Sequence, residues 1–205
     1  IRKWADAANM RLALERGPCP DAIDAGLCLR FSNMLAVAPT ANISIIAGSC
    51  SPCVEPWMAN IFTHKTLSGL FVVKNKHLEV VLRSYGMDND KIWDSILENR
   101  GSVQHLNINQ YVKDVFKTAF EIDQLAIIKL AGARAKYMDQ SQAINLFLPT
   151  NITTNLLCKI HAYAWRAGLK SLYYIRILDV NKVNFIPDEI HKEPEPEPEE
   201  CMVCQ

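Results

Sequence analysis

Residues 143–178 carry the sequence pattern that says most about the fold, because two strand-like apolar runs flank a helix-like segment. Ala143–Leu148 and Leu172–Leu178 are two short apolar runs, and each is typical of a buried strand. Between them, Thr153–Ala167 carries apolar residues at helical spacing and is followed by Gly168. A strand, a helix and a strand at this spacing predict a parallel βαβ unit with a right-handed crossover. We therefore expect an α/β fold.

The rest of the chain is expected to be mainly helical. Helical spacing predicts helices over Ile1–Arg16, Asp21–Leu29, Asn75–Tyr85, Asp88–Asn99 and Gln110–Ala131. The last of these is the strongest, because a single apolar stripe at i, i+3 and i+4 spacing runs along it. The stripe consists of Val112, Val115, Phe116, Ala119, Phe120, Ile127 and Ala131. Asn33–Ala38, an apolar run that ends at Pro39, predicts a further buried strand.

Charge is distributed unevenly along the chain. Its 205 residues hold 22 basic and 22 acidic side chains, and the hydrophobic content of 49% is enough for one domain. Residues 187–200 contain seven acids and one Lys, which leaves residues 1–186 with 21 basic against 15 acidic side chains. A mildly basic body suits a protein that handles anions. No expected helix has a strongly basic face, so nucleic-acid binding is not supported.

Cysteine usage and hydropathy bear on the compartment. The seven cysteines are an odd number, and the sequence shows no signal peptide. No run of eighteen apolar residues is present, so no membrane span is expected. These features favour a cytoplasmic protein with reduced thiols.

Residues 187–205 are expected to form a flexible, disordered arm that carries two cysteines. Alternating Pro and Glu cannot build a core, because proline lacks an N–H donor and like charges repel. The arm ends in Cys201-Met-Val-Cys204. A CxxC pair suits thiol–disulfide exchange, since the second thiol resolves the mixed disulfide that the first one forms. The alternative is a disordered tail with two incidental cysteines.

A short polar segment after the expected strand could bind phosphate. It consists of Thr40, Ala41, Asn42, Ile43 and Ser44. A strand that ends in such a turn leaves backbone N–H groups free, and a following helix start adds the positive end of its dipole. The alternative is an ordinary loop.

Tyr173 and Tyr174 could form a redox pair. Phenols can lose an electron and a proton together, and adjacent phenols could therefore pass a radical along. In a regular strand, however, neighbouring side chains point to opposite faces, so a stacked pair must lie at a strand end. The alternative is β-propensity combined with core packing.

Three other features invite weaker hypotheses. Cys50-Ser-Pro-Cys53 is a second CxxC pair, and two such pairs could form a Cys₄ zinc site. The whole domain separates the two pairs, and no Cys or His lies close to either, which argues against zinc. His161 is expected to be packed or partly exposed, and Glu55 is assigned no chemistry.

In their order along the chain, these motifs resemble the C-terminal part of the large, catalytic subunit of class I ribonucleotide reductase, in a bacterial or phage-like version. The motifs are Pro39-Thr-Ala-Asn-Ile-Ser-Ile-Ile-Ala-Gly48, Val54-Glu-Pro56, Asn60-Ile-Phe-Thr-His-Lys-Thr-Leu-Ser-Gly69, Gly101-Ser-Val-Gln-His105, Asp139-Gln-Ser-Gln142, Ala164-Trp-Arg-Ala-Gly-Leu-Lys170, Tyr173-Tyr-Ile-Arg176 and Cys201-Met-Val-Cys204. The resemblance implies that residues 1–186 form the C-terminal half of a ten-stranded α/β barrel, and that residues 187–205 form its flexible redox tail.

The resemblance also implies site roles in reducing ribonucleoside diphosphates to deoxyribonucleotides for DNA synthesis. Thr40–Ser44 would bind the substrate diphosphate, largely through backbone amides, because Asn42 and Ile43 stand where relatives often carry hydroxyl residues. Tyr173 and Tyr174 would relay a radical from the small subunit to an active-site cysteine. Cys201 and Cys204 would re-reduce the active-site disulfide and exchange with thioredoxin or glutaredoxin.

The resemblance places the remaining parts of the enzyme elsewhere. The radical or metal cofactor belongs to the small subunit, and the ATP and dATP effectors bind in another part of the large subunit. No cofactor or metal is expected on this chain. The radical cysteine lies upstream in the family, so the chain is expected to be inactive without an N-terminal part of the large subunit, whether it is a truncated record or a split-gene product. The alternatives are a fragment of a class II, adenosylcobalamin-dependent reductase, which would lack the tyrosine pair, and a non-catalytic thiol- or zinc-binding interaction module.

Overall fold

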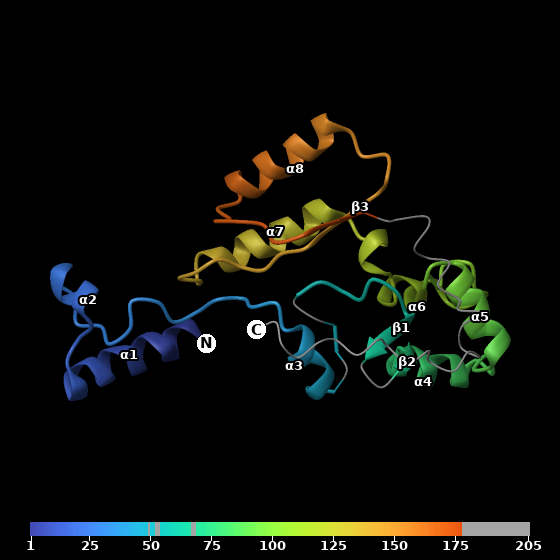
Figure 1. Ribbon diagram of the computed structural model, residues 1–205, viewed down its shortest axis with the longest axis horizontal. Helices are drawn as coiled ribbons and strands as arrows, with labels where there is room; N and C mark the ends of the chain where they lie inside the picture. The colour runs from blue at the N-terminus through green and yellow to red at the C-terminus, as the bar shows by residue number, and fades with distance from the viewer. Residues whose placement is uncertain (49, 52–53, 67–68, 178–205) are drawn as a thin grey trace, which may run out of the picture. The chain divides into compact units, whose positions relative to one another are not determined.

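The computed structural model describes residues 1–48, 50–51, 54–66 and 69–177 (Figure 1). The described residues fall into two compact units. Unit 1 comprises residues 1–58 and 118–177, and unit 2 comprises residues 59–117. Within the described ranges, no helix is long and apolar enough to cross a membrane.

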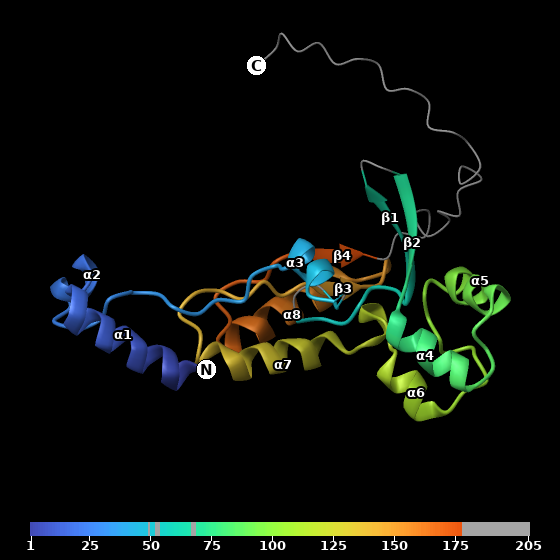
Figure 2. The ribbon, with the colours of Figure 1, turned by 90° about the horizontal axis from the view of Figure 1, so that it is seen from below.

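Unit 1 contains the expected βαβ arrangement. Strand β3 (Leu146–Leu148), helix α8 (Thr154–Arg166) and strand β4 (Ile175–Ile177) follow one another along the chain. The two strands are parallel neighbours, with Leu146 opposite Ile175 (Figure 2). The Thr153 side chain caps α8 by accepting a hydrogen bond from the Leu156 N–H. The predicted order and pairing are therefore confirmed, although both strands are shorter than expected.

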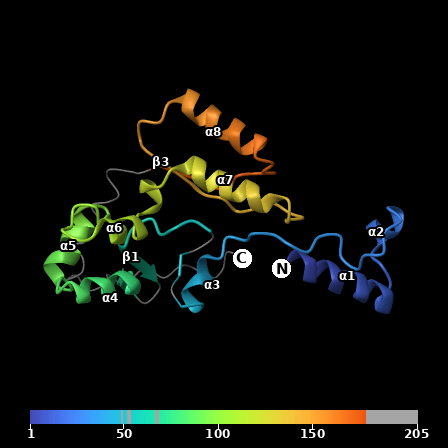
Figure 3. The same ribbon diagram turned by 180° about the vertical axis from the view of Figure 1, so that it is seen from behind.

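The core of unit 1 lies where α8 and helix α7 (Gln124–Ala135) pack against β3. The two helices contact one another, as Figures 1 and 3 also show. The buried members of this core are Ile127, Ile128, Ala131, Ile144, Leu146, Leu148, Ile160, Ala164 and Leu169. Apolar burial of this kind is the main source of stability for such a layer.

The N-terminal part of unit 1 is helical and differs in detail from the sequence predictions. Helix α1 (Arg2–Arg16) is confirmed. Helix α2 (Pro20–Asp24) ends earlier than predicted, because Gly26 adopts a φ of 66° and the Leu27 N–H turns back to the Ala22 carbonyl at 2.7 Å.

The predicted strand over Asn33–Ala38 is wrong as a strand. Only Val37 forms a bridge, which is parallel and pairs with Gln142. The N–H groups of Met34 and Leu35 donate to the side chain of Asp139 instead of to a neighbouring strand. A side-chain acceptor therefore takes these two N–H groups, while Val37 keeps backbone hydrogen bonds to residues 141 and 143.

The predicted single helix over Gln110–Ala131 is also wrong. The segment forms helix α6 (Gln110–Val115), the short 3₁₀ helix η1 (Ala119–Glu121) and α7. Thr118 has an extended backbone, and its N–H donates to the side chain of Glu121 at 2.8 Å. Thr118 is therefore the N-cap of a separate helix, η1. Asp123 then caps α7 by accepting from the Leu125 N–H at 3.0 Å. Two N-terminal caps thus override the continuous apolar stripe.

Unit 2 combines a β-hairpin with three helices. Strands β1 (Ile61–Thr66) and β2 (Gly69–Lys74) pair antiparallel. The sequence patterns above did not predict these two strands. Helices α4 (Lys76–Ser84) and α5 (Asp90–Glu98) were predicted, and asparagine side chains at positions 75 and 89 cap them. The fully buried side chains of Leu78, Leu82, Trp93, Ile96 and Val103 form the centre of the unit 2 core.

Candidate functional site

Tyr173 and Tyr174 lie immediately before β4, with their ring centroids 4.1 Å apart and their ring planes inclined by 54°. Both side chains are about half exposed. This is the strand-end position that a stacked pair requires, since adjacent residues within a regular strand would point apart. The guanidinium of Arg176 lies 5.6 Å from the centroid of the Tyr174 ring, within the range of a cation–π contact.

The backbone of the tyrosine pair is held by the segment that runs into β3. The Tyr173 N–H donates to the Ile144 carbonyl at 2.8 Å, and the Leu146 N–H donates to the Tyr174 carbonyl at 2.9 Å. The pair therefore belongs to the same parallel sheet as β3, one step before β4 begins.

The polar segment Thr40–Ser44 itself forms the start of a helix, whereas the sequence predicted a turn with a helix start after it. Thr40 is the N-cap of helix α3 (Ala41–Ile46), and the Ser44 N–H donates to the Thr40 carbonyl at 2.8 Å. The first N–H groups of any helix have no partner within that helix, so they can bind an acceptor. Ser44 is buried, whereas Ile43 is exposed.

The chain after α3 contacts the residue that precedes β3. The Ser44 carbonyl accepts from the Cys50 N–H at 3.2 Å and from the Cys50 thiol at 3.6 Å. Further along, the Ser51 hydroxyl donates to the Glu55 carbonyl. The buried Glu55 carboxyl group then accepts from both the N–H and the side-chain amide of Asn145, at 2.7 and 3.2 Å.

The two edges of the segment around β3 have different partners. Even-numbered residues 144 and 146 bond to the tyrosine backbone, while the N–H groups of odd-numbered residues point to the opposite edge. There, the N–H groups of Ala143, Asn145 and Phe147 donate to the Val37 carbonyl, Glu55 Oε1 and Gln124 Oε1, at 2.8, 2.7 and 2.8 Å. The loop after α3 and the tyrosine pair thus meet opposite edges of one segment.

The Asn145 side chain has one unusual atom. Its Oδ1 is buried, and it has no hydrogen-bond partner among the described residues. Buried acceptors are normally paired, so this oxygen stands out within unit 1. The amide nitrogen of the same side chain points to Glu55.

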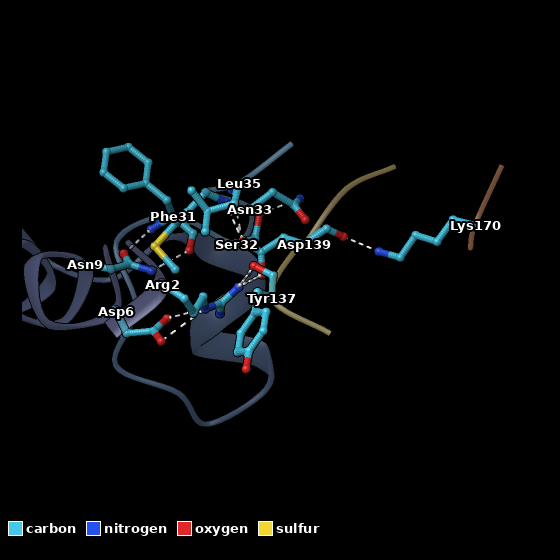
Figure 4. Close-up of polar contacts among 11 residues, drawn as sticks. Arg2, Asp6, Asn9, Phe31, Ser32, Asn33, Leu35, Tyr137, Asp139 and Lys170 are labelled. Carbon is cyan, nitrogen blue, oxygen red and sulfur yellow. Dashed lines mark hydrogen bonds and ion pairs between the residues drawn. The ribbon is translucent and has the colours of Figure 1, made fainter. Parts of the chain in front are cut away.

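Asp139 organises the segment that leads to α3 (Figure 4). Its Oδ2 accepts from the N–H groups of Met34 and Leu35 at 2.9 and 3.1 Å, and its Oδ1 accepts from Arg2 at 2.6 Å. The bond from Arg2, and after it the bonds from the two N–H groups, holds the pKa of Asp139 below the ordinary 3.8. Lys170 donates to the Asp139 carbonyl.

Sequence reasoning missed the structural roles of Glu55 and Asp139. Both belong to the quoted motifs, but their partners are 90 and about 105 residues away along the chain. No local spacing signals such contacts. His161 matches its expectation, because it is exposed and its Nδ1 lies 2.9 Å from the Leu157 carbonyl oxygen.

Several predicted residues lie outside the described ranges. They are Cys53, Cys201 and Cys204, together with all of residues 187–205. Cys50 is exposed and has a free thiol. In the part of the chain that the structure describes, no three His, Cys, Asp or Glu side chains are grouped so that they could hold a metal ion.

Residues 24–175 match the family model described as the ribonucleotide reductase barrel domain. The chain belongs to the ribonucleotide reductase family. The expected α/β class and barrel membership are thereby confirmed, and they agree with the parallel β3–β4 pairing.

Individual relatives are named as reductase subunits. The chain is 42% identical over 212 residues to the ribonucleoside-diphosphate reductase large subunit of Invertebrate iridescent virus 3, covering 100% of this chain and 33% of the relative. It is 37% identical over 174 residues to the large subunit of Trypanosoma brucei brucei, covering 82% of this chain and 20% of the relative. The chain thus spans a third or less of these relatives.

A solved structure has the same fold. The class Id ribonucleotide reductase alpha subunit of Actinobacillus ureae superimposes with a TM-score of 0.76 at 36% identity. The match covers 89% of this chain and 33% of that subunit. The structural neighbour is therefore a much longer polypeptide.

Proposed function

We propose that residues 1–186 form the C-terminal part of the catalytic barrel of a class I ribonucleoside-diphosphate reductase large subunit, with residues 187–205 as its redox tail. The complete enzyme reduces ribonucleoside diphosphates to deoxyribonucleotides. The observation that carries the proposal is the tyrosine pair, whose rings lie 4.1 Å apart at the start of β4 in a chain of this family. The similarity to a class I alpha subunit supports the same choice.

Tyr173 and Tyr174 form the radical relay in this proposal. Each phenol loses an electron and the proton of its O–H when it is oxidised, and regains both from the next group along the path. Rings at 4.1 Å exchange an electron directly, without an intervening side chain. The oxidant comes from the small subunit, which holds the metal or radical cofactor. The radical ends on a cysteine in another part of the large subunit, and this cysteine gives up an electron and the proton of its S–H.

Thr40–Ser44 binds the diphosphate of the substrate. The N-terminal N–H groups of α3 and the positive end of its dipole favour an anion there. Ile43 and Asn42 offer no hydroxyl group, so backbone donors carry most of this binding. The ATP and dATP effectors bind outside this chain.

Cys201 and Cys204 complete the cycle as a dithiol shuttle. Reduction of the ribose 2′-position leaves a disulfide in the active site. One tail thiolate attacks this disulfide, the second resolves the mixed disulfide, and the two electrons pass from the tail to the pocket. Thioredoxin or glutaredoxin then reduces the tail.

The test uses the complete large subunit that contains this chain, together with its small subunit. Tyr173→Phe and Tyr174→Phe each remove only the phenolic O–H, so each should abolish turnover while the Kd for a ribonucleoside diphosphate stays within about threefold of the original value. Tyr163→Phe is the matched control, because this exposed tyrosine on α8 has no part in the proposed relay. Retained turnover in either relay variant rejects the proposal.

A further inference from the structure

A single peptide group connects Tyr173 to a buried carboxyl group. The peptide group that joins Ile144 and Asn145 is planar, and its C=O and N–H point in opposite directions. Its C=O accepts from the Tyr173 N–H at 2.8 Å, and its N–H donates to Glu55 Oε1 at 2.7 Å. Rotating this group to break one hydrogen bond therefore strains the other.

The position of Glu55 suits it for holding this peptide group. Its side chain is only 4% exposed, so water does not readily replace a lost hydrogen bond. Both of its carboxyl oxygens bond to Asn145, one to the backbone and one to the side-chain amide. The Ser51 hydroxyl also donates a hydrogen bond to the Glu55 carbonyl.

We infer that Glu55 is a positioning residue for the tyrosine pair. This inference rests on the proposed function, since the pair must be placed for radical transfer. Glu55 touches neither phenol. It fixes the orientation of the Ile144–Asn145 peptide group, and this group fixes the backbone from which the two rings stack. Because Glu55 lies on the loop after α3, it also ties the proposed diphosphate segment to the relay.

The edge of β3 offers a matched control residue. Gln124 is buried like Glu55, and its Oε1 accepts from the Phe147 N–H at 2.8 Å on the same edge. The peptide group that it holds joins Leu146 and Phe147, which lies beyond the groups bonded to Tyr173 and Tyr174. Losing Gln124 should therefore weaken unit 1 without releasing the tyrosine backbone.

Asn145 Oδ1, which has no hydrogen-bond partner in the described part of the chain, predicts which substitution of Glu55 is tolerated. In Glu55→Gln, the amide oxygen can still accept from the Asn145 N–H. The new NH₂ group faces the Asn145 NH₂ group, but a rotation of the Asn145 amide brings its free Oδ1 into the acceptor position. Glu55→Gln should therefore keep the peptide group in place, whereas Glu55→Ala removes both acceptors.

The first experiment measures hydrogen exchange of the Tyr173 amide in the full 205-residue chain, with the Ile128 amide in α7 as the reference for opening of unit 1. Glu55→Ala should speed exchange at Tyr173 at least about tenfold more than at the reference amide. Glu55→Gln and Gln124→Ala should keep the ratio of the two rates within about threefold of the original. If Glu55→Ala does not fold, Glu55→Asp replaces it, because the shorter side chain moves the carboxyl group away from the Asn145 N–H.

The second experiment measures turnover in the complete enzyme with its small subunit. Glu55→Ala should lower kcat at least about tenfold while the KM for the ribonucleoside diphosphate changes less than about threefold. Glu55→Gln should restore most of kcat. Gln124→Ala should lower the melting temperature but leave kcat per folded molecule nearly unchanged.

The two experiments separate this inference from the proposed function. Unchanged protection of Tyr173 in Glu55→Ala overturns the positioning role, as does an equal loss of kcat in Glu55→Ala and Gln124→Ala. Failure of Glu55→Gln to restore kcat also overturns it. Retained turnover in Tyr173→Phe rejects the relay itself, while the exchange measurement still decides whether Glu55 holds the backbone of Tyr173.

Discussion

Gly101 lies so close to Ala59 that a Cβ atom at position 101 would be 2.3 Å from the Ala59 Cβ. Gly101 also has a φ of 77°, and its carbonyl accepts from both the N–H and the side-chain amide of Asn60. Two constraints, close approach and a left-handed backbone, therefore act on the same residue.

Gly101→Ala should lower the free energy of unfolding of unit 2 by about 3 kcal/mol or more, because backbone strain and overpacking add. Gly86→Ala is the matched control, since Gly86 has a φ of 67° but nothing within 4 Å of an added Cβ. The control should cost only about 1 kcal/mol. Denaturant unfolding, followed by the fluorescence of the buried Trp93, gives both values. Equal losses would show that the contact with Ala59 is unimportant.

Gly132 in α7 lies close to Ala167, the residue that ends α8. An added Cβ would lie 2.8 Å from the Ala167 carbonyl oxygen and 3.0 Å from its Cβ. Alanine favours a helix over glycine by about 1 kcal/mol, but the clash with backbone should outweigh this gain. We expect Gly132→Ala to destabilise unit 1 by about 1 kcal/mol, measured by hydrogen exchange in α7. Ala133→Gly, at the exposed neighbouring position, measures the effect of helix propensity alone. If Gly132→Ala stabilised unit 1, this would contradict the close contact between Gly132 and Ala167.

Sequence patterns predict the parts of this fold whose signals are local. The βαβ order follows from apolar runs and the Thr153 cap, and the stacking of Tyr173 and Tyr174 requires the strand end at which they lie. The long helix over Gln110–Ala131 fails because two caps, at Thr118 and Asp123, compete with an apolar stripe that shows no break. Capping residues therefore decide such cases better than periodicity does.

Contacts that are distant along the chain could not be read from the sequence. Glu55 and Asp139 each accept backbone N–H groups of a segment far away, so neither spacing nor composition reveals their roles. The β-hairpin of unit 2 is different, because Ser68-Gly69 between two β-prone runs is a local turn signal in the sequence. Residues 40–44 lie at the start of α3, and their role in phosphate binding stays a prediction.

His105 makes the stability of unit 2 depend on pH. Desolvation, and then the charge of Lys113, holds its pKa below the ordinary 6.5, while its Nε2 lies 2.6 Å from the Ser95 hydroxyl. Because folding disfavours the protonated form, stability is complete above the unfolded pKa of 6.5 and falls as protons bind below it. The unfolding midpoint of unit 2 should therefore decrease between about pH 7 and pH 5.

His105→Gln should flatten this pH dependence, since the titrating ring is gone. Lys113→Met should reduce it in part, because the repelling charge is the smaller of the two causes. Denaturant midpoints at both pH values, read from Trp93 fluorescence, measure the effect. An unchanged slope in His105→Gln would assign the pH dependence to another group.

Asp139 should make unit 1 sensitive to acid in the same direction as His105 does for unit 2, but in a lower pH range. Its pKa is held below 3.8 in the folded chain, chiefly by Arg2, so its contribution is present above that value and is lost as pH falls through the lowered pKa. Asp139→Asn should cost about 2 kcal/mol near neutral pH, because charged hydrogen bonds to two backbone N–H groups are weakened. The difference in free energy of unfolding between Asp139→Asn and the original chain should become smaller at acid pH.

Asp6→Asn is the matched control for Asp139, because both carboxylates bind Arg2 and only Asp139 reaches residues 34 and 35. Asp6 is nearly half exposed, so its loss should cost less than about 1 kcal/mol. Hydrogen exchange at the Met34 and Leu35 amides provides the measurement. Comparable exchange in the two variants would mean that Asp139 does not hold this segment.

The terminal cysteines should matter for repeated turnover and not for the first. Cys201→Ser or Cys204→Ser removes one half of the proposed dithiol but leaves the pocket thiols intact, so a pre-reduced complete enzyme should still form about one equivalent of product. Multiple turnover with thioredoxin should fall to background, because that protein is too large to reach a buried disulfide. Dithiothreitol is small enough to reduce the pocket directly and should partly restore activity. Cys158→Ser, an exposed free cysteine on α8, is the matched control and should behave like the original enzyme with either reductant. An equal loss with thioredoxin and dithiothreitol in the Cys201 or Cys204 variant would place these thiols outside the shuttle.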